Sequence, residues 1–244
     1  MKKTIFSLIL SMGIVLFSFG QAPLSPQNNP VDYSLVKNES SKMKWFVLQD
    51  TMKIEIGTIQ TDVQKKGNEL IVISTIDLNR SPVKWVDSTI VKTDRFKPVY
   101  HSSYNQQRDM ALHFKEEITG YYLDKMNNKK VMISEKADQS YFDSNFYPQL
   151  IRWLPLKEGY SGIISIFDYN PVAKIGVITA TITQVKDSTL LSHGLPKETW
   201  IVTTTDDISD NEVVSTYYIE KSSRKVLKQE IDIKGKKMLM ELID

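Results

Sequence analysis

The chain has 244 residues, with 31 basic and 29 acidic side chains and no cysteine. The lack of cysteine excludes structural disulfides, cysteine-based zinc sites, a thiol nucleophile and a lipid-modified N-terminal cysteine. Lysine and glutamate are interleaved without a basic stripe, so we do not expect nucleic acid as a partner. Apolar burial must therefore stabilise the fold, and a domain of this size hides roughly 70 % of its unfolded surface.

Residues 1–20 have the three parts of a secretory signal. Lys2 and Lys3 supply the positive start, an apolar run from Ile5 to Phe19 follows, and a small-x-small cleavage site ends at Gly20. A membrane anchor is the alternative, but a spanning helix needs about 20 apolar residues and this run is shorter. We expect export, with the periplasm favoured over secretion, and no membrane span after cleavage. Loss of the two lysines leaves a net charge near zero.

Residues 21–42 are rich in Pro, Asn, Gln and Ser, which predicts a flexible leader or a loosely docked arm. Beyond them, apolar and polar residues alternate between turn-rich connections, which predicts β-strands. A Lys-Gly-Asn centre at Lys66-Gly67-Asn68 indicates a hairpin between the first two strands. The expected strands are residues 51–63, 70–79, 84–93, 98–106, 111–118, 120–126, 129–137, 161–169, 174–185, 198–206, 212–221, 224–233 and 237–243.

The alternation gives several strands one apolar and one wet face. In 174–185, for example, Ile178, Ala180 and Ile182 share one side, as in an antiparallel sheet with one solvated face. About eleven to thirteen strands are too many for a small flat sheet. We therefore expect a mainly β fold, a strongly curved antiparallel sheet or open β-barrel. It would form a single domain over residues 43–244, with possible sub-halves that meet near residue 140.

Residues 144–154 break the strand pattern and predict one short helix. Its apolar stripe, at helical spacing, consists of Tyr147, Leu150, Ile151 and Leu154. Ser144 is placed to cap its start and Pro148 fits its first turn. A helix of about two turns is too short to be stable alone, so we expect it to plug the concave side of the sheet.

Few residues suggest catalysis or metal binding. His101, His113 and His193 lie in different predicted elements and have no metal-binding spacing. Gly159-Tyr160-Ser161-Gly162 lacks the G-x-S-x-G spacing of a nucleophile elbow. No glycine-rich phosphate loop is present. We expect no catalytic residues, no metal and no cofactor.

The acidic run 205–212 allows two interpretations. Its Asp, Ser and Asn residues favour a hairpin turn that bonds its own backbone. A calcium loop is the alternative, but the glycine and the distal glutamate of an EF-hand loop are missing.

Aromatic residues in or beside the predicted strands and the plug are either core or the wall of a ligand cavity. A curved sheet with a short plug leaves space on its concave side, and such cavities are mostly apolar with a few polar groups. The candidate wall residues are Trp85, Tyr100, Trp153, Phe167, Trp200 and Tyr218.

Several motifs resemble an uncharacterised family of exported bacterial proteins, the domain of unknown function 3108. They are Leu154-Pro155-Leu156-Lys157-Glu158-Gly159-Tyr160, Phe167-Asp168-Tyr169-Asn170-Pro171, Glu198-Thr199-Trp200, and residues 217–220 and 224–230. The resemblance covers most of the chain after the signal and implies no known activity. More distantly, the expected fold is similar to periplasmic open barrels that carry lipoproteins or lipids, a likeness that does not determine function.

Three functions remain open. The first is a non-enzymatic envelope protein that binds an apolar or amphipathic, lipid-like ligand on its concave face. The second is an interaction module that offers a sheet edge or an apolar patch to another envelope protein or to the cell wall. The third is a hydrolase whose site is assembled from distant residues.

Overall fold

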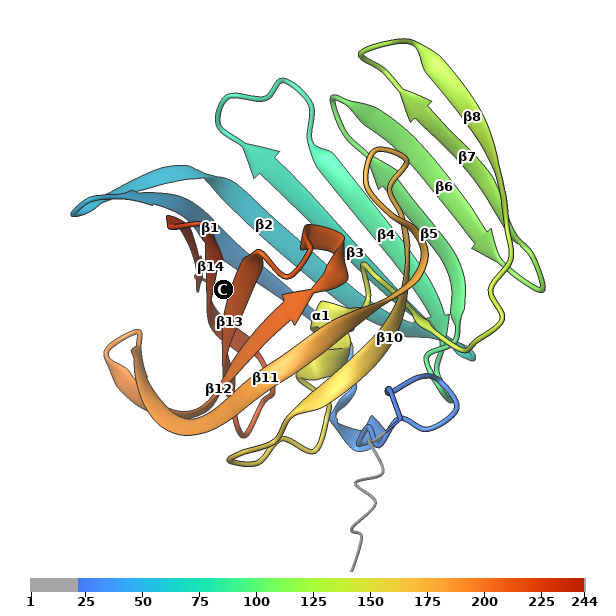
Figure 1. Cartoon of the computed structure of the whole chain (residues 1–244). Helices are drawn as coiled ribbons and strands as arrows, with labels where there is room; N and C mark the ends of the chain where they lie inside the picture. Colours follow the sequence, from blue (N-terminus) through green and yellow to red (C-terminus); the bar gives the residue numbers. More distant parts are fainter. Residues whose placement is uncertain (1–21, 244) are drawn as a thin grey trace, which may run out of the picture.

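The computed structural model describes residues 22–243, so the expected signal segment lies outside the described residues. Within them the chain forms one sheet of fifteen strands (Figure 1). The strands are β1 (Glu39–Gln49), β2 (Met52–Lys66), β3 (Glu69–Leu78), β4 (Trp85–Lys92), β5 (Pro98–Tyr104), β6 (Arg108–Phe114), β7 (Ile118–Asp124), β8 (Lys129–Glu135), β9 (Phe142–Asp143), β10 (Gly162–Tyr169), β11 (Ile175–Ser192), β12 (Leu195–Asp206), β13 (Val213–Glu220), β14 (Val226–Ile233) and β15 (Lys236–Leu242).

The sheet consists of two meanders, β1–β8 and β9–β15, which the chain connects through residues 136–141. The ladder between β1 and β15 joins them, with Trp45 opposite Met240. Neighbouring strands are antiparallel except β9 and β10, which are parallel. The expectation of a mainly β, strongly curved antiparallel sheet is confirmed, and β8 and β9 remain at opposite ends of the strand order.

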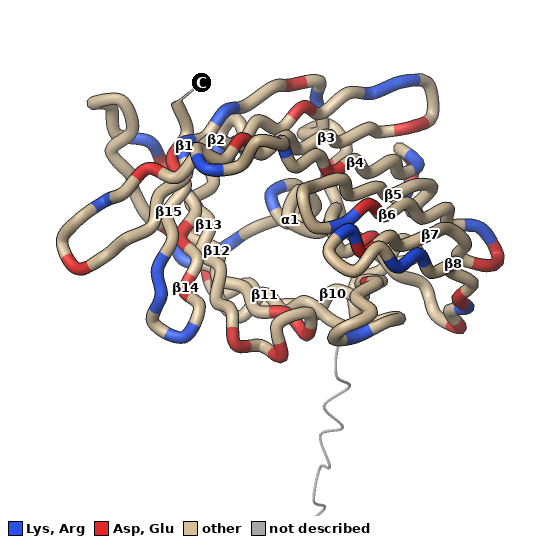
Figure 2. Tube along the Cα trace, turned by 90° about the horizontal axis from the view of Figure 1, so that it is seen from above, with Lys and Arg blue, Asp and Glu red and all other residues tan. Residues whose placement is uncertain are grey.

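The sheet rolls up, and bulges contribute to its curvature. The register shifts at Trp45/Phe46 in β1 and at Ile182/Gln184 in β11, and such bulges bend a strand and increase its twist. Seen from above, the strands curl around the α1 helix (Figure 2). The alternation of Ala180 and Ile182 toward the core is confirmed, since both are buried.

The two ends of the roll meet through side chains. Ile164 and Ile166 on one face of β10 belong to the main core, whereas Phe167 and Tyr169 on its other face pack with buried residues of β6 to β8. Phe114 contacts Phe167 edge to face, with ring centroids 5.9 Å apart. We call this contact of β9 and β10 with the inner face of β4 to β8 the seam. Strand β10 is therefore buried on both faces.

The helix α1 (Tyr147–Ile151) is the expected plug, although shorter than the predicted 144–154. Its apolar stripe is buried as predicted, and Leu150 and Ile151 have no exposed surface. The predicted cap is wrong: Phe146 occupies the N-cap without a side-chain bond, and the Ser144 hydroxyl donates to Asp168 at 2.7 Å. A helix of this length depends on packing, and the sheet provides it.

Of the two alternatives for residues 21–42, a flexible leader or a loosely docked arm, the described residues 22–38 form an arm that packs on the core. Leu24, Val31 and Val36 are buried in the main core, and the 3-10 helix η1 (Tyr33–Leu35) follows. Leu24 also forms a parallel bridge with Ile164. β1 begins at Glu39 and was missed. The polar composition of this segment gave no sign that three of its apolar residues pack in the main core.

The connection expected between residues 185 and 198 is also corrected. β11 and β12 continue through this segment as a long hairpin that projects from the roll (Figure 1). His193 and Gly194 form its turn with positive φ angles of 49° and 77°. Leu191 and Leu195 near the turn are 71 % and 61 % exposed.

Candidate functional site

Three neighbouring hollows lie on the inner side of the roll above α1. The rim groove, of about 430 Å³, is bounded by the loops after β3, β5 and β10. The seam hollow, of about 200 Å³, shares Trp85, Arg108 and Asn170 with it. The plug hollow, of about 210 Å³, shares Asp87 and Asn145 with the seam hollow. These common lining residues place the three hollows next to one another, and together they form the candidate site.

The rim groove combines apolar walls with neutral amides. No acidic side chain lines it, and Arg108 is its one charged lining residue within the described chain. Its apolar and aromatic residues are Leu78, Val83, Trp85, Tyr122 and Val172. Val83 and Val172 are 49 % and 89 % exposed, so the groove opens to solvent between apolar side chains.

A buried polar network forms the base of the seam. Asp143 on β9 accepts a hydrogen bond from the Thr89 hydroxyl at 2.8 Å and lies 2.8 Å from Nδ1 of His101. The Asn145 amide donates to Thr89 at 3.0 Å. Thr89 and His101 lie opposite one another on β4 and β5. The network therefore connects β9, at one end of the sheet, to β4 and β5.

Nearby carboxylates raise the pKa of His101 against the effect of burial. Burial, the largest single influence, lowers the pKa of His101, but the charge and hydrogen bond of Asp143 raise it, with help from Asp87 and Asp168. The result is a pKa above the usual 6.5. For Asp168 burial acts in the other direction and raises the pKa above its usual value, although the hydrogen bond from Ser144 opposes this shift. The imidazolium form is therefore stabilised inside the fold.

Trp85 and Arg108 form the boundary between the rim groove and the seam hollow. The Trp85 indole donates to Asp87 at 2.6 Å and to the Ser103 hydroxyl at 3.2 Å. The Arg108 guanidinium donates to the same hydroxyl at 3.2 Å, while its buried Nε has no partner within the protein. The indole is fixed by its hydrogen bonds, whereas the guanidinium keeps unused donors.

The plug hollow contains another arginine, Arg152, which is buried and already paired. Arg152 after α1 forms an ion pair with Glu39 and donates to the carbonyl of Arg224 at 3.1 Å. Burial lowers the pKa of Arg152 to about 10, and its guanidinium lies 4.8 Å from the Trp153 ring centroid. Arg152 therefore fixes the plug to β1 and to the turn before β14.

The six predicted wall residues divide into three groups. Only Trp85 lines an open hollow. Trp153 and Phe167 are each 1 % exposed and form part of the core, while Trp200 packs beside the core under Lys221. Their placement in an open wall is corrected, because neighbouring side chains fill the space around them.

Tyr100 and Tyr218 lie on the outer face of the sheet. Tyr100 precedes the inward-facing His101 and contacts the His113 ring at 5.1 Å. Tyr218 follows the buried Tyr217 and lies under the Lys228 ammonium. Since successive strand residues face opposite sides, neither tyrosine reaches the concave face, and their prediction as cavity wall is wrong.

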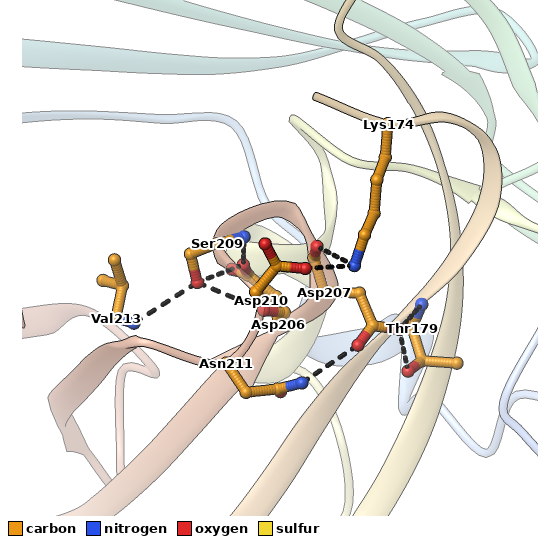
Figure 3. Close-up of polar contacts among 8 residues, drawn as sticks. All are labelled: Lys174, Thr179, Asp206, Asp207, Ser209, Asp210, Asn211 and Val213. Atoms are coloured by element: carbon orange, nitrogen blue, oxygen red, sulfur yellow. Dashed lines mark hydrogen bonds and ion pairs between the residues drawn. The ribbon is translucent and has the colours of Figure 1, made fainter. Parts of the chain in front are cut away.

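The acidic run forms a tight turn closed by its own side chains (Figure 3). Asp206 accepts from the backbone of Ser209 at 3.1 Å, and Asp207 accepts from the Thr179 hydroxyl at 2.7 Å. Lys174 pairs with Asp210 at 2.5 Å. The 3-10 helix η2 (Asp207–Ser209) replaces a simple hairpin turn, and protein donors occupy these carboxylates.

Sequence reasoning missed His101, Asp143, Asp168 and Arg108 as site residues. One signal was available: Phe142-Asp143-Ser144-Asn145 repeats the F-D-x-N pattern of residues 167–170. The two copies lie side by side, with Phe167 paired to Asp143. Asp143 contacts His101 directly, and Asp168 is close enough to raise the pKa of His101. The repeat alone would not have placed either aspartate near His101.

The arrangement builds half of a familiar catalytic unit. An imidazole held by a buried aspartate is the base and its orienting group in a triad. Within residues 22–243, however, no hydroxyl bonds to the other nitrogen of His101, and the nearby Thr89 hydroxyl donates to Asp143. Across the same residues, no three histidine or carboxylate side chains converge as metal ligands.

The described residues form a β-barrel-like curved sheet whose two ends are not joined by a strand ladder. A solved structure from Brucella abortus, described as a beta-barrel-like protein of the domain of unknown function DUF1849, has a similar fold, with a TM-score of 0.51 and 9 % identity. The match covers 84 % of this chain and 95 % of that one. Residues 40–241 match the family described as protein of unknown function DUF3108, and the chain belongs to that family. None of the curated proteins matches it.

Within the described part of the chain, no helix is long and apolar enough to cross a membrane.

Proposed function

We propose that this protein is a non-enzymatic binding protein of the cell envelope that holds an amphipathic small molecule on the concave side of its rolled sheet. The observation that carries the proposal is the rim groove. Its apolar walls lead to a polar base around Trp85 and Arg108. Ligand sites commonly combine apolar walls with a few fixed polar groups.

The size of the groove favours a single-chain ligand. Small-molecule sites occupy about 300–1,000 Å³, and the rim groove, at about 430 Å³, lies in the lower part of this range. The main core, α1 and the two smaller hollows occupy the remainder of the concave side. A ligand with one short apolar chain or ring system fits this space better than a lipid with two long chains.

The predicted export supports an envelope role. This prediction rests on residues 1–20 alone. The prediction is that protein recovered from the periplasm begins at Gln21. Intact-mass measurement of that fraction tests it, and a chain that retains Lys2 and Lys3 in the cytoplasm would contradict the proposed location.

A second candidate function, an interaction module, is favoured by the projecting β11–β12 hairpin. Leu191 and Leu195 near its turn are exposed, and exposed apolar side chains on an arm suit contact with another protein. The free edge of β8 is a weaker candidate, because Lys129 and Lys130 lie on it and edge lysines oppose strand pairing.

Native mass spectrometry of the periplasmic protein tests the binding function. We expect a bound mass that disappears on denaturation, is lost in Trp85→Ala, and is kept in the matched control Trp200→Ala. Both tryptophans are half-buried on the inner face, but only Trp85 lines the groove. A clean mass for the wild-type protein, even after incubation with single-chain amphiphiles, contradicts the proposal and favours the interaction module.

A further inference from the structure

Among the described residues, Arg108 makes no ion-pair contact at the base of the rim groove, although its charge partly offsets the rise that burial causes in the pKa of the nearby Asp168. Within residues 22–243 no carboxylate lies within ion-pair distance of its guanidinium, in contrast to Arg152, which pairs with Glu39. The one side-chain hydrogen bond of Arg108 goes to the neutral Ser103 hydroxyl. Its Nε is buried and without a partner in the protein. An arginine has five N–H donors; Nε is buried here, so the terminal Nη groups are the donors that a ligand would meet.

The surroundings of Arg108 select an anion. The rim groove has no acidic lining residue, and the amides of Asn105, Gln107 and Asn170 provide neutral polar groups beside the arginine. The guanidinium geometry suits a carboxylate or a phosphate oxygen pair. A partly desolvated cation in a groove without acids therefore attracts an anionic group to the junction with the seam hollow.

The seam hollow prevents an anion from moving deeper. Asp87 and Asp168 line it beyond Arg108, and both carboxylates would repel a second negative charge. The apolar groups lie on the other side of Arg108, toward the rim: Val83 and Val172 are exposed there, and the ring of Trp85 forms one wall. This distribution orients a ligand with its head at Arg108 and its apolar part toward the opening.

We propose that the rim groove binds an anionic, single-chain amphiphile whose carboxylate or phosphate head is held by Arg108 and whose apolar part rests on Trp85, Val83 and Val172. This inference rests on the proposed binding function and names its ligand class. Carboxylate and phosphate heads share the chemistry that Arg108 recognises, so the experiment includes both.

Isothermal titration with four probes of equal chain length tests the inference: decanoate, decyl phosphate, decanol and decyltrimethylammonium. We expect the two anions to bind more tightly than decanol and the cation to bind most weakly. A hydrogen bond to a charged group corresponds to roughly a 10- to 150-fold change in affinity. Arg108→Gln should weaken the binding of the preferred anion by this factor and leave the affinity for decanol unchanged.

Two variants separate the charge from the fold. Arg108→Lys keeps the charge without the planar donor set, so it should retain part of the affinity. Arg80→Gln in the exposed turn after β3 removes the same charge outside the groove lining and should bind like the wild-type protein. Equal effects of Arg80→Gln and Arg108→Gln would show a general charge effect and overturn the inference.

The outcomes distinguish the two proposals. If all four probes bind equally and Arg108→Gln has no effect, the groove binds apolar molecules and the assignment of an anionic head to Arg108 is wrong. Preference for the cation overturns the assignment too, since Asp87 and Asp168 would then dominate. If no probe binds and the periplasmic protein carries no ligand, the binding function itself fails. A preference between decanoate and decyl phosphate identifies the head group.

Discussion

The buried pair of His101 and Asp143 predicts a large cost for Asp143→Asn. Asp143 is 0 % exposed and lies 2.8 Å from the His101 ring. Removing one partner of a buried pair costs about 3–5 kcal/mol, because the other charge remains buried without compensation. The exposed pair of Lys44 and Glu55 is also separated by 2.8 Å and provides the control. Glu55→Gln should cost at most about 1 kcal/mol.

The pH dependence of the effect has a definite sign. The pKa of His101 is raised in the folded protein, so the stabilisation from its protonation is complete below about pH 6.5 and is lost as pH rises through the folded pKa. In Asp143→Asn, burial becomes the dominant influence and lowers this pKa. The variant should therefore lose stability as pH falls, by at most about 1.4 kcal/mol per pH unit for one proton.

Urea unfolding at about pH 5.5 and about pH 8.5, on either side of the usual histidine pKa of about 6.5, measures both quantities. Asp87, Asp168 and Arg108 face the same hollow and are unchanged in the variant, so the difference between the two pH profiles belongs to the pair. If Asp143→Asn costs no more than Glu55→Gln at both pH values, or follows the wild-type pH profile in parallel, the pair does not stabilise the seam.

Two further substitutions test the plug and the sheet. Leu150→Ala on α1 should lower the free energy of unfolding by about 2–5 kcal/mol, since the side chain is fully buried; thermal unfolding that stays within about 0.5 kcal/mol of wild type would show that the plug is dispensable. Gly120→Ala should disrupt the β6–β7 pairing, because a Cβ there would collide with the carbonyl oxygen of Ala111. Gly67→Ala meets open space and has only its positive φ of 61° to oppose it, so it should cost about 1–2 kcal/mol; equal costs at both glycines would refute the argument from close approach.

Local patterns predicted the elements well because strand alternation and turn chemistry are local properties. The Gly67-Asn68 turn placed β2 and β3, and the spacing of Tyr147, Leu150 and Ile151 identified the plug. The Pro- and Asn-rich arm was misjudged for the opposite reason. Its three apolar residues have no periodicity, and their burial against Ile164 depends on contacts across the chain.

The candidate site was less predictable, because its residues meet only when the roll closes. Asp143 lies 42 residues from His101 and 54 residues from Thr89 in the chain. Tyr100 shows the limit of a purely compositional choice: it is aromatic and lies in a strand, yet one position in register places it on the outer face. Trp85 was chosen by the same criterion and does line the rim groove.

The seam has a mechanical consequence. No backbone–backbone hydrogen bond crosses from β9 or β10 to β4–β8 among the described residues, so the two ends of the sheet are held together by side chains and by the connecting residues 136–141. Every ladder from β8 around to β9 can stay intact while Phe114 moves relative to Phe167 or His101 relative to Asp143. The circumference of the roll can therefore change at the cost of a few side-chain contacts. A closed barrel of the same strands would have to break a complete strand ladder.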